Sequence, residues 1–510
     1  MYLIVNLGLK SIRIIVFSDV GKIIYSDSFP VHTSLQGGKI EQDAAEWKIL
    51  LHKLLDNLVK KTDLIPKIEF ITSTTSSSCV FGCNRQMKPI TKVLMVSDKR
   101  ACEEADFIKT NSIYIEKNIK EPVCCNESSN VPKLLWVKNN ATEVFNDIKY
   151  WLGANEFLNY EFTGEVVTDS LNASKSFYSE EEGQYHEDIL DDITIPSSIF
   201  PEVIEMGSAL GLSNDLMDLY PFNKKCKYVI TTYDAICAVI GSLTGESGDV
   251  CDVSGTVTSA RALAKKDFYI KNKSSVILRQ SVPLIDHTII GCSNNLGGGI
   301  IEWYKQAYYS NATKGYAEIE SDAQESPSGA NGLLFLPFLL GERAPFVDKD
   351  IRGAFFGINR ESNRQDFAKA VFESTAYVTN DLLRLIRNED FKIKALCVSG
   401  GLARFDLINQ IKADVTNLPV KVIDNFESTS MGALILIRVS LGHYDTVHSA
   451  AADLVSIRKT IFPNKNNVEI YSDAFDLYRK MTELTRSIGA SHREFSQRIQ
   501  KYSSTTVKNL

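Results

Sequence analysis

The start of the chain alternates short apolar runs with polar turns and then changes to a helical spacing. Two β-branched runs at 2–5 and 12–17 flank the turn at 6–11, which predicts a β-hairpin. From Asp43 onward the apolar residues recur every three or four positions, with Asp43 as the N-cap and Glu46 in the place of a capping box. A hairpin followed by a helix predicts a mixed α/β sheet with an antiparallel start.

The second half of the chain repeats this order of elements. A strand at 228–230 leads into a helix from Asp234, and the segment 250–263 predicts a strand, a turn of small residues and another strand. A helix at 365–378 and a strand at 395–399 follow, and this strand ends in a glycine turn. Two hairpin-led units predict a duplicated α/β fold with a cleft between its halves.

Domain boundaries follow from the repeat. We expect a first domain at 1–245, a second at 246–468, and a C-terminal helix and tail at 469–510. The acidic, aperiodic segment 161–200 predicts a solvated surface insertion, with an acidic binding patch as the alternative. The C-terminal helix is expected at 473–502, because its apolar residues fall on one stripe.

Composition narrows the classes of function. The 510 residues carry 56 Lys and Arg against 63 Asp and Glu, a net charge of −7, which argues against nucleic acid as the main partner. No apolar run reaches the roughly eighteen residues that span a bilayer, and the start lacks the pattern of a signal peptide. The ten Cys residues form no CxxC pair. We therefore expect a cytoplasmic protein without a membrane contact.

Four glycine turns, three of which also contain hydroxyl residues, have a composition that suits phosphate binding. Glycine lets the backbone approach phosphate oxygens closely, and adjacent N–H groups and hydroxyls can bond to them. Each turn alone also fits a plain hairpin turn, and the sequence has neither a GxxxxGK[ST] loop nor a GxGxxG loop after a strand. The four turns are 6–11, 254–258, 297–299 and 399–401.

Longer motifs occur in a fixed order along the chain. Residues 41–47 read Glu-Gln-Asp-Ala-Ala-Glu-Trp, residues 132–136 read Pro-Lys-Leu-Leu-Trp, and residues 341–345 read Gly-Glu-Arg-Ala-Pro. With the glycine turn at 400–401 and the later Met-Gly-Ala at 431–433, they resemble the FGGY family of carbohydrate kinases from about residue 2 to residue 465. The resemblance implies an α/β fold of two ribonuclease-H-like domains of the actin/hexokinase superfamily that flank a cleft.

The resemblance also implies a reaction, the ATP-dependent phosphorylation of a sugar or polyol hydroxyl. The family's general base is the Asp of a GxxDA segment, which corresponds to Asp234 before Ala235. A carboxylate there can accept the proton of the attacking hydroxyl, while most catalysis of phosphoryl transfer is positioning and charge stabilisation. The alternative is that Asp234 only caps the helix that begins at Ala235.

The resemblance assigns ATP to the glycine turns and Mg²⁺ to the first of them. In that first loop the family's metal-binding Asp is Asn6 here, and its phosphate-facing Thr is Leu9. Mg²⁺ is therefore expected at Asn6, at Asp234 and on the ATP phosphates. The nucleotide-binding residues implied are Gly8, Ser11, Gly255, Thr256, Gly299, Gly400 and Gly401.

The acceptor site departs from the xylulose kinase pattern. Ser76 and Ser77 stand where that pattern often has Met and His, and Val96 replaces a Trp, whereas Asp98 is retained. We expect Ser76, Ser77, Asp98 and Asp234 to contact a ketose such as xylulose, an aldonate or a polyol. The alternative is a non-catalytic or weakly active homologue that binds sugar or nucleotide. A homodimer is an assembly compatible with either interpretation.

Overall fold

The computed structural model of the chain forms two compact units. It describes residues 1–110, 125–255, 257–272, 276–285, 287–310, 315–424 and 427–507. Unit 1 comprises Met1–Gly241 and Thr429–Ala450, and unit 2 comprises Ser242–Ser428 and Ala451–Leu510. The segment Thr429–Ala450, which the expected boundaries place in the second domain, therefore packs with the first unit.

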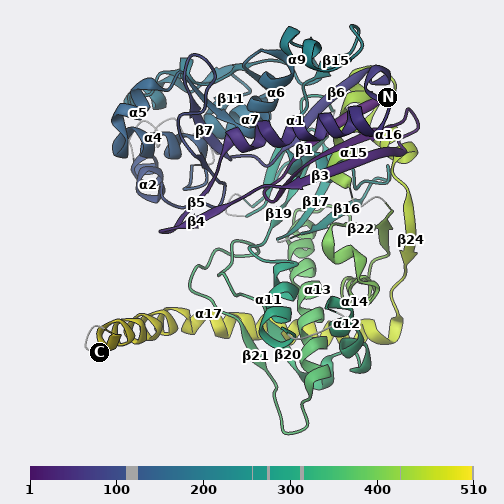
Figure 1. The fold of residues 1–510 in the computed structure, drawn as a ribbon. Helices are drawn as coiled ribbons and strands as arrows, with labels where there is room; N and C mark the ends of the chain where they lie inside the picture. The colour runs from purple at the N-terminus through teal and green to yellow at the C-terminus, as the bar shows by residue number, and fades with distance from the viewer. Residues whose placement is uncertain are drawn as a thin grey trace. The chain divides into compact units, whose positions relative to one another are not determined.

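Unit 1 is built on a 6-stranded mixed sheet in the order β14-β15-β6-β1-β2-β3 (Figure 1). The predicted hairpin is confirmed: β1 (Tyr2–Leu7) pairs antiparallel with β2 (Ser11–Phe17). On its other side β1 pairs parallel with β6, which in turn pairs parallel with β15. The remaining strands of the sheet are β3 (Ile23–Pro30), β6 (Phe70–Thr75), β14 (Ala209–Gly211) and β15 (Lys227–Val229).

The first helix forms as predicted, with one difference at its start. In α1 (Ala44–Lys61) the Asp43 side chain accepts a hydrogen bond from Ala45 N, so Asp43 is the N-cap. The predicted capping box is wrong, because the Glu46 carboxylate accepts from His32 N rather than from the N-cap backbone. The apolar side of α1, including Trp47, packs against the central sheet in the core of unit 1.

A second sheet and several short helices complete this part of unit 1. The 5-stranded sheet runs in the order β4 (Ser34–Gln36), β5 (Lys39–Gln42), β8 (Val93–Leu94), β7 (Val80–Cys83) and β9 (Tyr150–Gly153). Two-stranded pairs are formed by β10 (Val167–Thr168) with β13 (Glu202–Val203), and by β11 (Tyr178–Ser179) with β12 (Gln184–Tyr185). The helices are α2 (Cys102–Thr110), α4 (Asn130–Asn140), α5 (Thr142–Asp147), α6 (Ala154–Thr163), α7 (Ser170–Ala173), α8 (Glu187–Asp192), α9 (Asn214–Leu219) and α10 (Asp234–Ile240).

The prediction that residues 161–200 form a solvated insertion is wrong for the segment as a whole. Its acidic run around Glu181 is exposed, but Phe177, Ile189 and Leu190 are buried in a core cluster with side chains of α4. Each helix in the segment is only one or two turns long and buries one or two apolar residues. Such pieces are too short to show a hydrophobic period, which is why the sequence pattern missed them.

The returning segment contains nearly all of α15 (Ser428–Ser440) and the first half of α16 (Val447–Leu454). A Cβ atom placed on Gly432 would lie 1.8 Å from the carbonyl oxygen of Cys237, so α15 and α10 meet backbone against backbone. Residues 433–437 of α15 are fully buried. The position of α10 in unit 1 therefore depends on the missing side chain at Gly432.

Unit 2 repeats the hairpin-led arrangement around a 7-stranded sheet. As predicted, β16 (Asp249–Ser254) pairs antiparallel with β17 (Thr258–Lys265), and on its other side it pairs parallel with β22 (Ala395–Ser399). The remaining strands of this sheet are β18 (Leu278–Ser281), β19 (His287–Ser293), β23 (Val420–Ile423) and β24 (Ile457–Ile461), and β20 (Leu334–Leu336) pairs with β21 (Ala354–Phe356) outside it.

One long helix packs against the sheet of unit 2, and a longer one packs outside it. The predicted helix at 365–378 is the first part of α13 (Arg364–Asn388), and the C-terminal helix α17 (Lys465–Val507) is longer than predicted. In Figure 1 the end of α17, in yellow, extends away from the rest of unit 2. The other helices are α11 (Gly299–Tyr308), α12 (Tyr316–Glu325) and α14 (Asp406–Thr416).

A buried carboxylate joins α13 to α17. Glu373 accepts hydrogen bonds from Gly329 N at 2.8 Å and from the Tyr471 hydroxyl at 2.9 Å. Burial raises the pKa of Glu373 to about 7, against the lowering effect of these hydrogen bonds. The core of unit 2 therefore contains an acid that changes charge near neutral pH.

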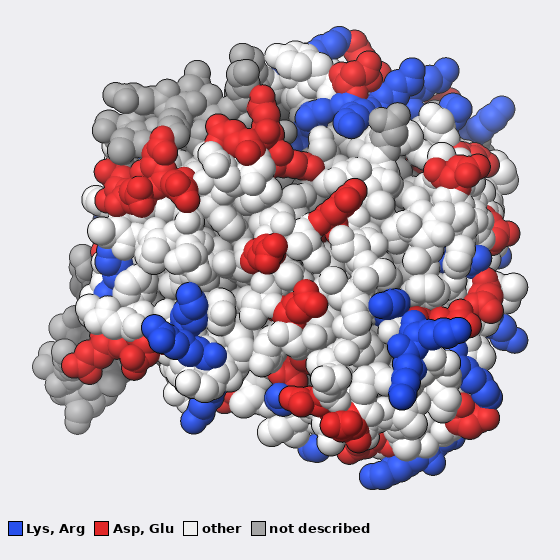
Figure 2. Space-filling view, turned by 90° about the horizontal axis from the view of Figure 1, so that it is seen from above, with Lys and Arg blue, Asp and Glu red and all other residues white. Residues whose placement is uncertain are grey.

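Charges of both signs are spread over the surface. On the face shown in Figure 2, Lys and Arg form several separate groups, with Asp, Glu and uncharged areas between them. Within the described ranges, none of the helices combines the length and apolar character that a membrane crossing requires.

We predict that Gly432→Ala destabilises the protein by about 1–3 kcal/mol, because the added methyl group forces α15 and α10 apart. Gly211→Ala is the matched control, since a Cβ at Gly211 meets nothing within 4 Å. Urea denaturation of both variants measures the effect. A midpoint of Gly432→Ala equal to that of the control would contradict the close approach of the two helices.

We predict that Glu373→Gln reduces the loss of stability on raising the pH. The unfolded acid ionises near its ordinary pKa of 4.5 and the folded one near 7, so the stability that the protonated side chain contributes is present below pH 4.5 and lost as the pH rises through 7. Between pH 5 and pH 8 the Tm of the variant should therefore fall less than that of the wild type. Glu361→Gln, at an exposed position, is the control, and parallel curves for wild type and Glu373→Gln would refute the prediction.

Candidate functional site

In unit 1 several of the predicted site residues, but not Asp98, lie at the carboxyl ends of parallel strands. Because β1 and β6 pair in register, with Leu7 opposite Thr75, the turn after β1 lies beside the end of β6. Gly8 N donates to Ser11 O at 3.0 Å within the turn, and Ser76 N donates to Leu7 O at 3.1 Å. Ligand sites in open α/β sheets typically occupy this edge.

Asp234 stands at the same edge, after the four residues that follow β15, and contacts Ser76. The Ser76 hydroxyl donates to Asp234 Oδ2 at 2.8 Å, and both residues are partly buried. The alternative that Asp234 is only an N-cap is wrong, since Tyr233 is the N-cap of α10 and Asp234 is its first helical residue. The structure thus brings together Asp234, Ser76 and the Gly8 turn of the sequence prediction.

Asp98 is held by protein donors on both carboxylate oxygens. Oδ2 accepts from Ile40 N at 2.7 Å, and Arg100 donates from Nε at 2.8 Å to Oδ1 and from Nη2 at 2.7 Å to Oδ2. Burial raises the pKa of Asp98, but the hydrogen bonds from Arg100 and Ile40 outweigh burial and keep this pKa below its ordinary value. Arg100 also pairs with Glu41 at 2.7 Å. Asp98 therefore fixes the strand region around Ile40, and its contact with a substrate stays a prediction.

Sequence reasoning gave no role to Lys133, which lies in the motif at 132–136. Its side chain is fully buried, and Nζ donates to Ser78 O at 2.8 Å and to Met95 O at 2.9 Å. Burial lowers the pKa of Lys133 to about 8. The lysine ties the segment after Ser77 to the segment before Val96, the two segments of the expected acceptor site.

In unit 2 the glycine turns at 297–299 and 399–401 converge on the turn of the β16–β17 hairpin. Gly255 N donates to Val257 O at 3.0 Å, and Gly298 N donates to Gly255 O at 2.7 Å. Thr258 N donates to the side chain of Asn294 at 2.8 Å. These bonds fix the hairpin turn against the start of α11, where Gly299 is the first helical residue.

The converging turns require glycine because backbone meets backbone. Gly400 has a φ of +83°, and a Cβ there would lie 2.9 Å from the carbonyl oxygen of Ser254. A Cβ on Gly297 would lie 2.3 Å from Thr258 Oγ1. The predicted residues Gly255, Gly299, Gly400 and Gly401 therefore gather around one turn, whereas the predicted Thr256 lies outside the described residues.

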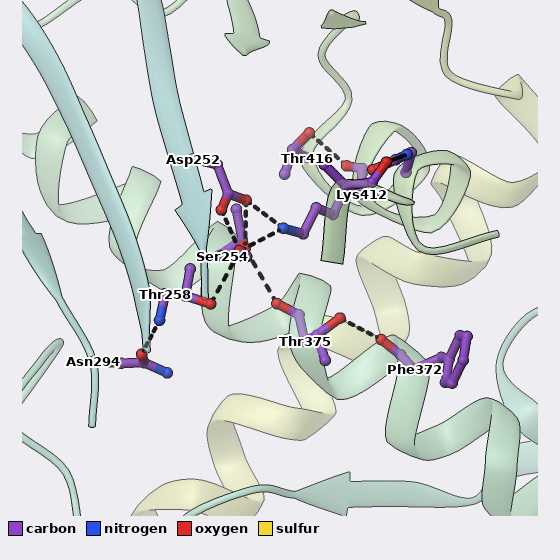
Figure 3. A network of polar contacts seen from close by, with 11 residues as sticks. Asp252, Ser254, Thr258, Asn294, Phe372, Thr375, Lys412 and Thr416 are labelled. Atoms are coloured by element: carbon purple, nitrogen blue, oxygen red, sulfur yellow. Dashed lines mark hydrogen bonds and ion pairs between the residues drawn. The ribbon is translucent and has the colours of Figure 1, made fainter. Parts of the chain in front are cut away.

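A buried polar network lies under this turn (Figure 3). Lys412 of α14 pairs with Asp252 of β16, and Lys412 Nζ also donates to Ser254 Oγ at 3.0 Å. The sequence analysis singled out neither Asp252 nor Lys412. The sequence gives little indication that these two residues are buried, because charged residues such as a lysine in a helix are usually exposed.

The motif at 341–345 contacts the segment 293–295, which precedes the Gly297 turn of the same site. Glu342 accepts from Asn295 N at 2.9 Å and from Arg343 N at 2.8 Å, while Arg343 Nε donates to Ser293 O at 3.0 Å. Burial raises the pKa of Glu342 to about 7. These contacts hold the segment that leads into the Gly297 turn.

The donor set fits a magnesium ion that arrives with a phosphate ligand. Among the described residues, no group of three or more His, Cys, Asp or Glu could hold a metal ion. Asn6 offers an amide oxygen and Asp234 a carboxylate. Mg²⁺ at phosphate sites is commonly held by one or two carboxylates together with phosphates and waters, so these two residues suit it as additional ligands.

Known proteins that resemble this chain include xylulose kinases, gluconokinases and a glycerol kinase. A xylulose kinase of Staphylococcus epidermidis is 26% identical over 496 residues, which covers 95% of this chain and 97% of the relative. A gluconokinase of Bacillus subtilis is 23% identical over 498 residues and covers 94% of this chain and 95% of the relative. The solved structure of a xylulose kinase from Lactobacillus acidophilus has a TM-score of 0.86 at 22% identity, covering 97% and 100% of the two chains, so the fold is shared.

Family models match both parts of the chain. The N-terminal domain of the FGGY family of carbohydrate kinases matches residues 1–241, and the C-terminal domain matches residues 283–441. The predicted fold of two α/β domains of this family is thereby confirmed. The family resemblance drawn from the motifs is confirmed as well, and the chain belongs to the FGGY family of carbohydrate kinases.

Proposed function

We propose that the chain transfers the γ-phosphoryl group of ATP to a hydroxyl of a sugar or sugar acid, with Asp234 as the general base. The observation that carries this proposal is the position of Asp234 at the edge of parallel strands, with Ser76 donating to its Oδ2. The carboxylate takes the proton of the acceptor hydroxyl, whose oxygen forms the new bond to phosphorus. The bond from the γ-phosphorus to the bridging oxygen breaks, and ADP leaves.

The phosphates of ATP are assigned to the turns around Gly255 and Gly400, because glycine lets the backbone approach phosphate oxygens closely. Mg²⁺ would be held by Asn6 and Asp234 together with the phosphates, and when bound it would neutralise charge on the transferred group. The Gly8 turn supplies further backbone groups. We also infer a cytoplasmic location, where ATP is abundant.

The acceptor is assigned to the side of unit 1 that carries Ser76 and Ser77. Their short hydroxyl side chains, with Val96 in place of an indole, leave room and offer hydrogen bonds rather than an aromatic surface. Relatives named xylulose kinase and gluconokinase support a ketose or an aldonate as the class of acceptor. We infer a polar acceptor longer than a pentulose, such as an aldonate or a hexulose.

An ADP-release assay over a panel of ketoses, aldonates and polyols tests this function. We expect turnover on an aldonate or hexulose that exceeds turnover on D-xylulose. If D-xylulose is the best substrate by tenfold or more, the inferred acceptor is wrong, although the kinase function stands. If no acceptor raises ADP release above that of ATP alone, the kinase function is refuted.

We predict that Asp234→Asn lowers kcat by about 100- to 10,000-fold, the usual contribution of a general base. The affinity for ADP should stay within a few-fold, because the base acts on the acceptor. Steady-state kinetics and calorimetry with ADP measure the two effects, with the exposed Asp215→Asn as control. More than a tenth of the wild-type kcat in Asp234→Asn would remove Asp234 from this role.

A second candidate function is that of a weakly active or non-catalytic homologue, and Asn6 is the residue that favours it. We predict that Asn6→Asp lowers the half-saturating Mg²⁺ concentration about tenfold, equivalent to about 1.4 kcal/mol, because it places a charge near the dication. A magnesium titration of turnover compares it with the exposed Asn223→Asp. Activity seen only in Asn6→Asp would favour the second candidate, and an unchanged titration would show that Asn6 is only a structural residue of β1.

A further inference from the structure

One ion pair in unit 2 is buried directly under the turn of the β16–β17 hairpin. Lys412 Nζ donates to Asp252 Oδ2 at 2.5 Å, and the two side chains are only 2% and 0% exposed. Thr379 donates to the same Asp252 oxygen at 3.1 Å. A buried ion pair is weak grounds for stability, because an apolar pair of similar volume often serves as well. Such a pair can instead fix the position of one element relative to another, here α14 relative to β16.

The network reaches both ends of the turn. Lys412 Nζ donates to Ser254 Oγ at 3.0 Å, and the Ser254 hydroxyl donates to Asp252 Oδ1. Ser254 Oγ also lies 3.2 Å from Thr258 Oγ1. Ser254 and Thr258 are the residues at which the turn leaves β16 and enters β17, as Figure 3 shows. The side chains at both ends of the turn are thus fixed from below.

The same lysine connects this turn to the second glycine turn. Lys412 belongs to α14, which follows the turn at Gly400 after one short 3-10 helix, Gly401–Arg404. Gly400 approaches the backbone of Ser254 so closely that a Cβ there would lie 2.9 Å from its carbonyl oxygen. A shift of α14 relative to β16 would therefore open the space between the two turns.

We propose that Lys412 is a positioning residue for ATP, acting through its ion pair with Asp252 to hold Ser254 and Thr258, the two ends of the hairpin turn, against the turn at Gly400. The inference rests on the proposed function, since it takes these two turns as the nucleotide site. Donors that are already in place bind phosphate without an ordering cost. Without the pair, part of the binding free energy orders the turn.

The test removes both charges together, because a single substitution would leave an unpaired buried charge and disrupt folding. Asp252→Asn combined with Lys412→Met keeps the side-chain volumes nearly unchanged. We expect the Kd for ADP and the KM for ATP to rise about tenfold, while the KM for the best acceptor of the panel stays within twofold. If the pair had only a structural role, the variant would have a lower Tm, but its KM for ATP would not rise more than its KM for the acceptor.

The other end of β16 offers a matched control. Asp249 pairs with Lys421 at 3.1 Å, and both residues are buried, but this pair lies at the start of the strand. Asp249→Asn combined with Lys421→Met should leave the Kd for ADP within twofold even if its Tm falls. If this control weakens ADP binding as much as the Asp252 and Lys412 variant does, the effect is general destabilisation and the inference is overturned.

Two further outcomes are decisive. If the first variant folds and binds ADP like the wild type, Lys412 has no positioning role, while the proposed function is untouched. If that variant does not fold, Ser254→Ala, which keeps the ion pair but removes its link to the turn, should still raise the Kd for ADP about threefold, and an unchanged Kd overturns the inference. A wild type that binds no ADP refutes the proposed nucleotide site itself.

Discussion

In each unit the first strand pairs antiparallel with its hairpin partner on one side and parallel with a later strand on the other, and the candidate site depends on this double pairing. In unit 1 the strand is β1 between β2 and β6, and in unit 2 it is β16 between β17 and β22. The pairing places a hairpin turn beside the carboxyl end of the later strand. The Gly8 turn thus lies beside Ser76, and the Gly255 turn beside Gly400. The register of the backbone hydrogen bonds is therefore enough to bring each hairpin turn close to the end of the later strand.

Buried lysines then hold these neighbourhoods in place. Lys133 donates to two backbone carbonyls in unit 1, and Lys412 donates to Asp252 and Ser254 in unit 2. An ammonium group has three donors and sits on a flexible stem, so it can join segments that are far apart in the chain. In both units the lysine comes from a helix and its partners come from the segments that carry the expected ligand contacts. The fold supplies the turns, and these charged groups connect them to the neighbouring helices.

The sequence predicted the local elements better than it predicted the long-range contacts that hold them together. The two hairpins, the helix capped by Asp43 and the turns at Gly255 and Gly400 each depend on residues close together in the chain, which periodicity and turn chemistry describe. The partnership of Lys412 with Asp252 spans 160 residues, and a lysine in a helix usually indicates an exposed face. The burial of Phe177 and the return of Thr429–Ala450 to unit 1 were missed for the same reason, because both are set by tertiary packing.

The late return of α15 to unit 1 has a consequence for synthesis on the ribosome. The chain crosses between the units at 241–242, 428–429 and 450–451, so unit 1 lacks part of its core until the end of α15 has been made. During that time the surface of α10 against which Gly432 packs stays uncovered, and Asp234 begins that helix. Chains with consecutive domains can fold one domain at a time during synthesis. In this chain the packing of α10, which begins at Asp234, stays incomplete until α15 has been made. A fragment ending at Gly241 would carry the same exposed apolar surface permanently.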